Sequence, residues 1–153
     1  MIFVCAMTMA QTNAYPLLPM PQNYKVTDKS FAMGKVKLST PVLKSEWEAF
    51  IVNAGGELAD KAAAEIKVEL LPVIDGVKLN PDEAYRLSVS GKLIKIEAVT
   101  ERGVYWALQT LRQLEKKKGK KSLFAGCEIV DWPAFRIRGF MQDVGRSYIS
   151  VEE

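Results

Sequence analysis

The segment from Thr100 to Gly119 most strongly constrains how this chain folds. Its apolar residues recur every three or four positions, which is the spacing of one face of an α-helix. Thr100 stands where it can cap the start of the helix, and the run Lys116–Lys118 favours its C-terminal end. An apolar stripe of this length needs a partner surface, so we predict that the helix packs on a sheet. The stripe consists of Val104, Ala107, Leu108, Leu111 and Leu114.

Alternation of apolar and polar residues predicts strands before and after this helix. The clearest case is a hairpin over residues 80–99, in which Tyr85, Leu87 and Val89 alternate with polar residues and Gly91 marks the turn. Further strands are expected to begin near Tyr24 and to cover residues 34–40, 66–71 and 127–132.

Two further helical segments are expected between these strands. One runs from Ser45, a capping residue, to the pair Gly55-Gly56, which stops it. The other covers residues 57–65, where alanines and long polar side chains are strong helix formers.

This order of elements favours a small α/β (α+β-like) fold, in which a mixed β-sheet carries helices on one face. The 153 residues are 48% hydrophobic and 25% charged, which suits one soluble domain with its own core. The pattern breaks at residues 131–135, around Pro133, and we expect a second domain to begin there.

The sequence contains no histidine, which removes the commonest metal ligand and the commonest general base near neutral pH. Its two cysteines, Cys5 and Cys127, fit neither the spacing of a zinc site nor a disulfide framework. We therefore expect no metal site, and we expect Cys127 to be a buried small hydrophobe rather than a reactive thiol.

Residues 1–14 form a short apolar run followed by small and polar residues, which resembles the end of a secretory signal peptide. We therefore expect an exported protein, periplasmic or extracellular. No apolar run approaches the ~20 residues of a membrane span, and none is expected.

Paired carboxylates are the first candidates for acid–base catalysis in a chain without histidine. We interpret the acidic pairs as solvated surface, because they lie at a helix start, a turn and the end of the sequence. We interpret the neighbouring aromatic residues Tyr105 and Trp106 as helix–sheet packing rather than as a sugar platform. The acidic pairs are Glu46 with Glu48, Asp82 with Glu83, and Glu152 with Glu153.

The pattern of residues 136–143 predicts a strand that mixes apolar residues with Arg136, Arg138 and Asp143. Charges in such a strand are costly unless they are paired. Three interpretations stay open: a structural Arg–Asp ion pair, an exposed edge strand, or the wall of a pocket whose arginines donate to a polar ligand.

The segment from Asp131 to Glu153 resembles the entry to the catalytic barrel of the glycoside hydrolase family 20 β-N-acetylhexosaminidases. The family pattern R-G-x-x-x-D-x-x-R is met by Arg138, Gly139, Asp143 and Arg146, with Pro133 and Phe135 ahead of it. Upstream, the run Gly103, Thr110, Leu111, Gln113 and Leu114 is similar to the last helix of the noncatalytic N-terminal domain of that family.

The resemblance implies three parts: a signal peptide remnant at 1–14, a noncatalytic N-terminal α/β domain at 15–131, and at 132–153 the first strand of a truncated (β/α)8 catalytic barrel. It implies that Arg138 binds hydroxyl groups of a terminal N-acetylhexosamine in the parent enzyme. The catalytic Asp-Glu pair of the family lies further along the barrel, so no catalytic residue is expected in this chain. The missing barrel is expected to pack on this domain, and no organic cofactor is implied.

Two other classes of function compete with this interpretation. A free-standing carbohydrate-binding or interaction module would use Trp106, Tyr148 or the strand arginines as its platform. A nucleic-acid partner is not expected, because the net charge is only +3 and the lysine run has no accompanying aromatic or arginine surface.

Overall fold

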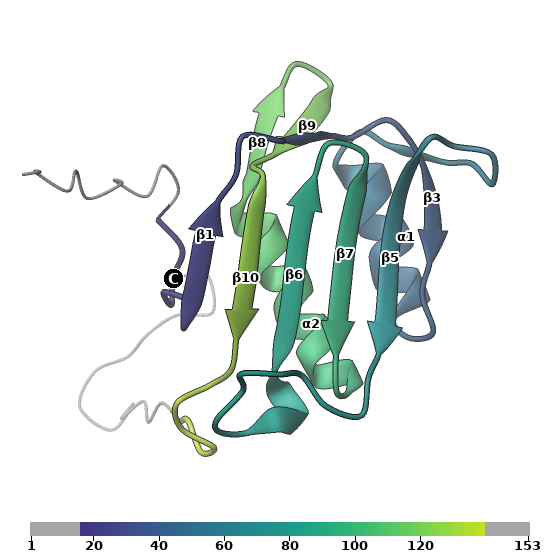
Figure 1. Cartoon of the computed structure of the whole chain (residues 1–153). Helices are drawn as coiled ribbons and strands as arrows, with labels where there is room; N and C mark the ends of the chain where they lie inside the picture. The colour runs from purple at the N-terminus through teal and green to yellow at the C-terminus, as the bar shows by residue number, and fades with distance from the viewer. Residues whose placement is uncertain (1–15, 140–153) are drawn as a thin grey trace, which may run out of the picture.

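The computed structural model describes residues 16–139, whose strands and helices are drawn in Figure 1. The elements are β1 (Asn23–Val26), β2 (Phe31–Ala32), β3 (Lys35–Ser39), α1 (Lys44–Asn53), β4 (Glu57–Leu58), β5 (Ala64–Leu70), the 3-10 turn η1 (Pro81–Glu83), β6 (Tyr85–Ser90), β7 (Leu93–Ala98), α2 (Glu101–Gln113), β8 (Glu115–Lys118), β9 (Lys121–Phe124) and β10 (Cys127–Asp131). None of the helices among these residues is long and apolar enough to cross a membrane.

Seven strands form the main sheet in the order β1-β10-β6-β7-β5-β3-β4. The half from β1 to β7 is antiparallel, and the half from β7 to β4 is parallel. The predicted mixed sheet and the hairpin of β6 and β7 are therefore confirmed. A second, three-stranded sheet of β2, β9 and β8 was not predicted.

Both helices lie on the same side of the main sheet, as Figure 1 shows. The sheet turns alternate residues toward them, so that Leu87 and Val89 of β6 and Ile94 and Ile96 of β7 are almost fully buried. The stripe of α2 covers these strands, while Trp47 and Phe50 of α1 extend the core. The sequence prediction of helices on one face of a mixed sheet is confirmed.

Helix α2 begins as predicted but ends earlier. Thr100 caps it, since the backbone N–H of Arg102 donates to the Thr100 hydroxyl. The helix ends at Gln113, and Lys116–Lys118 belong to strand β8 rather than to the end of the helix. Leu114 is the last residue of the apolar stripe, so a further helical turn would have no apolar side chains to pack on the sheet. The residues after it form β8, which pairs with β9.

The helix predicted for residues 57–65 is wrong. Strand β4 pairs in parallel with β3, and β5 then runs between β3 and β7 with Ile66 and Val68 buried. Pairing on both sides of a central strand outweighs the helix propensity of the alanines before it. Ser45 also fails as a cap, because α1 starts at Lys44 and has no side-chain cap.

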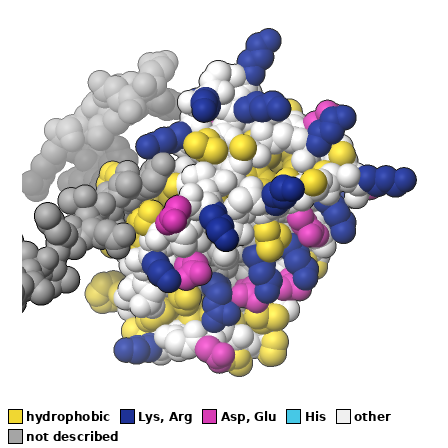
Figure 2. Space-filling view, turned by 45° about the horizontal axis from the view of Figure 1, so that its top comes forward, with side chains coloured by type: hydrophobic (Ala, Val, Ile, Leu, Met, Phe, Trp, Pro, Cys, Tyr) yellow, Lys and Arg dark blue, Asp and Glu magenta, His cyan; other side chains and the backbone are white. Residues whose placement is uncertain are grey.

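The face of the sheet that points away from the helices carries charged residues. Lys95 contacts both Glu69 and Glu97, at 3.1 and 2.7 Å, and Arg86 contacts Glu97 at 3.1 Å. Figure 2 shows basic and acidic side chains interspersed on the surface. Lys95 and Glu97 lie on the same strand, whereas Lys95–Glu69 and Arg86–Glu97 pair across neighbouring strands, so the charges of these four residues compensate one another.

Residues 132–139 follow β10 and form no strand. Trp132 packs with Ile74 and Ala84 in a small second cluster, and the side-chain amide of Asn80 donates to the carbonyl of Pro133 at 2.7 Å. The segment after β10 is thus held against the domain. The expected first barrel strand is absent from residues 136–139, and the rest of it lies outside the described residues.

We predict that Gly103→Ala destabilises the fold, although alanine favours helices by about 1 kcal/mol. A Cβ at Gly103 would stand 2.2 Å from the carbonyl oxygen of Ala84 and 3.0 Å from the Cβ of Ala98. We expect the free energy of unfolding in urea to fall by about 1–3 kcal/mol. Gly91→Ala, which meets open space in the hairpin turn, is the control and should change it by less than about 0.5 kcal/mol. Equal effects of the two changes would contradict the close approach.

Candidate functional site

Arg138, the residue that the sequence singles out as a ligand contact, lies against the 3-10 turn η1. Its guanidinium donates to the Glu83 carboxylate at 2.5 Å and to the carbonyl of Phe135. The same guanidinium stands over the ring of Trp106, 5.9 Å from the ring centre. Three elements far apart in the sequence therefore meet at this arginine.

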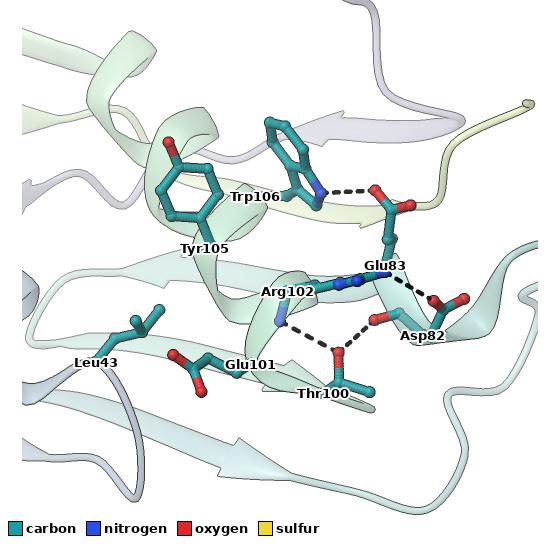
Figure 3. A pocket seen from close by; sticks show the side chains of 8 residues that line it. All are labelled: Leu43, Asp82, Glu83, Thr100, Glu101, Arg102, Tyr105 and Trp106. Carbon is teal, nitrogen blue, oxygen red and sulfur yellow. Dashed lines mark hydrogen bonds and ion pairs between the residues drawn. The ribbon is translucent and has the colours of Figure 1, made fainter. Parts of the chain in front are cut away.

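Glu83 is the centre of this cluster and is only 8% exposed. Trp106 Nε1 donates to its carboxylate at 2.8 Å, as the dashed line in Figure 3 shows. Turn η1 is itself fixed to the start of α2, because the Thr100 hydroxyl donates to the carbonyl of Asp82. The first turn of α2 and η1 thus position Glu83 below Trp106.

Two opposing effects act on the pKa of Glu83. Burial raises this pKa. The hydrogen bonds from Arg138 and Trp106 and the charge of Arg138 lower it by a larger amount, so the net pKa lies below its usual value. Glu83 is therefore held as a carboxylate. Such a carboxylate does not suit the role of a general acid, because a general acid needs a raised pKa to hold and donate a proton near neutral pH.

Two hollows flank Trp106. The first, of about 760 Å³, is shallow and lies between the starts of the two helices, where Figure 3 shows Leu43, Tyr105 and Arg102 around it. The second, of about 490 Å³, lies on the other side of Trp106, toward the segment after β10. Glu83 and Trp106 line both hollows, so the two share a ridge.

A second polar cluster lies at the wall of the 490 Å³ hollow. The Tyr85 and Thr110 hydroxyls are 2.6 Å apart, and Tyr85 also donates to Asp131 at 3.3 Å. Burial raises the pKa of Asp131, against hydrogen bonds from the backbone N–H groups of Gln22 and Trp132. Burial also raises the pKa of Tyr85. These groups satisfy one another and fix the ends of β6 and β10 to α2.

Two interpretations of the site from the sequence were wrong. The sequence predicts solvated surface for both Asp82 and Glu83, but Glu83 is buried, where Trp106 and Arg138 compensate its charge. The sequence predicts helix–sheet packing for Tyr105 and Trp106, yet they lie on the outer face of α2 with 44% and 40% of their area exposed. The helical period turns Val104 and Ala107 to the sheet, which leaves the two aromatic residues outside.

The other candidates form no site in the described part of the chain. Glu46 and Glu48 lie in the first turns of α1, where Glu48 pairs with Lys44 at 3.8 Å. Cys127 is fully buried, as predicted, and burial raises the pKa of its thiol to about 12. Glu152, Glu153, Tyr148, Asp143 and Arg146 lie outside the described residues. No group of three potential metal ligands occurs within residues 16–139.

Sequence reasoning reached Arg138 but missed Glu83. A signal was present: Glu83 lies two positions before the alternating strand 85–90, where an acidic residue next to buried strand residues needs a partner. The partner, however, comes from a segment 55 positions later. No local pattern identifies such a pair.

The described residues form an α/β domain with two surface hollows beside Trp106 and an arginine that is held by Glu83. A family model described as "Glycosyl hydrolase family 20, domain 2" matches residues 14–132. The chain therefore belongs to glycosyl hydrolase family 20, through the second domain of that family, as the sequence motifs indicated.

Curated relatives agree with this assignment. A β-hexosaminidase of Porphyromonas gingivalis is 28% identical over 153 residues, which covers 90% of this chain and 20% of the relative. A β-hexosaminidase of Vibrio furnissii is 34% identical over 93 residues, covering 61% of this chain and 14% of the relative. The chain thus spans about a fifth or less of the length of these relatives.

Solved structures show the same fold. The family 20 exo-β-N-acetylglucosaminidase of Vibrio harveyi, solved in complex with N-acetylglucosamine, matches with a TM-score of 0.67 and 32% identity. The match covers 92% of this chain and 22% of that enzyme. The chitobiase of Flavobacterium johnsoniae matches with a TM-score of 0.59 and 26% identity, covering 89% of this chain and 23% of that enzyme.

We predict that Glu83 and Arg138 are coupled energetically in the 153-residue chain. A double-mutant cycle of Glu83→Gln and Arg138→Met, measured by urea unfolding at pH 7, should give a coupling of about 1 kcal/mol, because Glu83 is buried while Arg138 is half exposed. The control cycle uses Lys25→Met and Glu128→Gln, an exposed pair 3.7 Å apart, and should give a few tenths at most.

The coupling should depend on pH in one direction. The pKa of Glu83 is lowered in the folded chain, so its stabilising effect is complete above its ordinary value of 4.5. It should be lost as the pH falls through the lower folded value, when the carboxylate takes up a proton. A coupling that persists unchanged at pH 2, or that matches the control cycle at pH 7, would refute the contact.

Proposed function

We propose that this chain is the accessory domain of an exported β-N-acetylhexosaminidase. The parent enzyme hydrolyses terminal N-acetylglucosamine or N-acetylgalactosamine from glycans, by a retaining route in which the acetamido group of the substrate attacks the anomeric carbon. The observation that carries the proposal is the match of domain 2 of the family over residues 14–132, together with relatives named β-hexosaminidase. The domain itself supports the catalytic part.

Arg138 is the residue that we propose for contact with the substrate. Its two bonds, to Glu83 and to the Phe135 carbonyl, engage two of the five N–H donors of a guanidinium. The remaining donors suit the hydroxyl groups of a sugar, which accept hydrogen bonds from a planar, permanently charged group. An arginine that is already oriented loses less conformational entropy when the ligand binds.

The described residues do not supply the catalytic pair of such an enzyme. Asp82 and Glu83 are an adjacent acidic pair, but Glu83 is held ionised by Arg138 and Trp106 and cannot serve as the general acid. Asp131, with its raised pKa, is engaged by Tyr85 and by the backbone of Gln22. We therefore propose that the chain alone is inactive and that hydrolysis belongs to the longer protein.

Export remains part of the proposal and rests on residues 1–14, whose apolar run and small residues resemble the end of a signal peptide. Glycans with terminal N-acetylhexosamines on cell surfaces and in extracellular polymers would be accessible to an enzyme in that location.

We predict that the purified 153-residue chain does not release 4-nitrophenol from 4-nitrophenyl N-acetyl-β-glucosaminide. The full-length protein that carries this chain should release it, and Arg138→Lys in that protein should raise KM by about tenfold, the effect of losing one charged hydrogen bond of ~1.4 kcal/mol. The colour of released 4-nitrophenol measures both. Turnover by the 153-residue chain, or none by the full-length protein, would overturn the proposal.

The second candidate, a free-standing carbohydrate-binding module, is favoured by one observation: Trp106 is exposed beside two hollows. The accessory-domain function predicts no heat of binding when the 153-residue chain is titrated with N-acetylglucosamine by calorimetry. Binding that disappears in Trp106→Ala, with the domain still folded by circular dichroism, would favour the module instead.

A further inference from the structure

We propose that the hairpin formed by β8 and β9 binds acidic polysaccharides through its positive charge. This lysine hairpin, residues 115–124, contains five lysines and one glutamate, which give it a formal charge of +4. The rest of the chain has 16 basic and 17 acidic residues, a sum of −1. The net positive charge of the chain therefore lies in this one hairpin. Its lysines are Lys116, Lys117, Lys118, Lys120 and Lys121.

The lysine hairpin lies apart from the cluster of Glu83, Trp106 and Arg138. That cluster is close to the start of α2, whereas β8 follows the C-terminal end of the same helix. In Figure 1 β8 and β9 lie at the top of the domain. Figure 2 brings this end forward and shows mainly basic side chains among the charged ones in the upper part of the view. The hairpin is thus a second surface, with a different chemistry.

One face of the lysine hairpin packs on the domain. Lys117 is paired with Ser122, which is buried, and its ammonium group donates to the carbonyl of Asn53 at 2.9 Å. Glu115, the one acidic residue of the hairpin, lies two positions before Lys117 and is 2.6 Å from its ammonium group. The charge of Lys117 is therefore compensated, and this face has a structural role.

The other face points to solvent and is basic. Neighbouring residues of a strand point to opposite faces, so Lys116 and Lys118 share the outer face. Lys121 joins them because it is directly opposite Lys118 in the hairpin. All three are exposed. Within residues 115–124, which the structure describes in full, no acidic residue lies on this face.

Lys118 and Lys121 form a pair of like charges that folding alone does not explain. Like charges directly opposite one another destabilise a pair of strands. Neither lysine forms an ion pair within residues 16–139. Lysines do protect an open strand such as β8, the last strand of its sheet, from pairing with another chain, but one lysine is enough for that. A second lysine opposite the first costs stability, which favours a role in binding.

The backbone of the lysine hairpin is fixed before any ligand arrives. The backbone N–H of Ser122 donates to the carbonyl of Ala54 at 3.0 Å, and the N–H of Met33 donates to the carbonyl of Ser122 at 2.9 Å. At the tip, the carbonyl of Lys120 lies so close to Gly55 that a Cβ at position 55 would collide with it. Binding would therefore order lysine side chains but no backbone, which lowers its entropic cost.

The residues beside the lysines distinguish between classes of anionic partner. Within residues 115–124, Phe124 is buried and Leu123 is only partly exposed, so no apolar side chain can insert into a lipid surface. The same residues contain no exposed aromatic ring to stack on bases and no arginine to grip a phosphate with two hydrogen bonds. Lysine acts as a point charge, which suits a partner recognised by charge alone.

The spacing of the lysines suits an extended polymer with repeated charges. Residues two apart on a strand are about 7 Å apart, and opposite residues are about 5 Å apart, so Lys116, Lys118 and Lys121 form a short row. Acidic polysaccharides carry carboxylate or sulfate groups at regular intervals along such a chain. The choice of a polysaccharide rests on the proposed function, because an enzyme that removes N-acetylhexosamines would be held on acidic glycans that contain them.

The test measures binding of a fluorescein-labelled chondroitin sulfate oligosaccharide to the 153-residue chain by fluorescence anisotropy. Lys118→Gln combined with Lys121→Gln should weaken binding about 25-fold, because each lysine near an anionic surface contributes about a fivefold gain in affinity. Lys61→Gln combined with Lys78→Gln is the matched control, since it removes the same charge from two exposed loop residues. It should change the affinity by less than about twofold, because distant charges are screened.

Lys121→Glu is a second variant that separates binding from folding. It places a carboxylate opposite Lys118, so the urea midpoint should rise slightly while binding of the oligosaccharide is lost. Lys118→Gln combined with Lys121→Gln should likewise keep or raise the midpoint. A lower midpoint in this double variant would show that the two lysines stabilise the fold, and that outcome contradicts the proposal.

Three further outcomes would overturn the proposal. They are no binding by the unchanged chain, equal losses of affinity in the hairpin and control variants, and an affinity that does not fall as the NaCl concentration rises. Tighter binding to a short duplex DNA, or to vesicles of phosphatidylglycerol, would assign the lysine hairpin to that partner instead of a polysaccharide.

The proposed function can fail separately from this inference. Hydrolysis of 4-nitrophenyl N-acetyl-β-glucosaminide by the full-length protein involves no acidic polymer, so Lys118→Gln combined with Lys121→Gln should leave it unchanged. A full-length protein without this hydrolysis, whose chain still binds the oligosaccharide through the lysine hairpin, would refute the proposed function and leave the binding surface in place. Hydrolysis without such binding would do the reverse.

Discussion

The close packing of α2 on the hairpin of β6 and β7 is the contact on which the rest of the domain depends. Gly103 lets the helix approach the backbone at Ala84, which immediately follows η1. This approach brings Glu83 within reach of Trp106. A bulkier residue at position 103 would separate the helix from η1, and the polar cluster would lose its geometry along with the core.

From this contact the molecule acquires two different sides. The outer face of the sheet carries cross-strand ion pairs, such as those of Lys95 with Glu69 and of Arg86 with Glu97. The helix side carries exposed aromatic residues, and the segment after β10 is anchored there through Glu83 and Arg138. The outer face of the sheet is therefore the more charged side of the domain, and the helix side is the more apolar one.

Much of the fold followed from local patterns in the sequence. The sequence predicts β6, β7 and α2 because each of them buries one face. Burial of one face makes apolar residues recur at every second position in a strand and at every third or fourth position in a helix. The helix predicted for residues 57–65 was wrong, because their alanines favour a helix locally. The pairing of β5 between two parallel strands depends on partners that are distant in sequence. The prediction that Lys116–Lys118 end the helix was wrong for a related reason. The helix ends at Gln113, and the lysines lie in β8, which pairs with β9.

The sequence alone determined the family and the core faces of β6, β7 and α2, since motif spacing and hydrophobic period are local properties. The tertiary structure decided what surrounds Arg138. Glu83 and Arg138 are separated by 55 positions, and only folding brings them together. The same holds for Trp106, whose exposure depends on which face of α2 the sheet covers. Charge compensation and exposure are properties of neighbours in space, which is why no pattern along the chain revealed them.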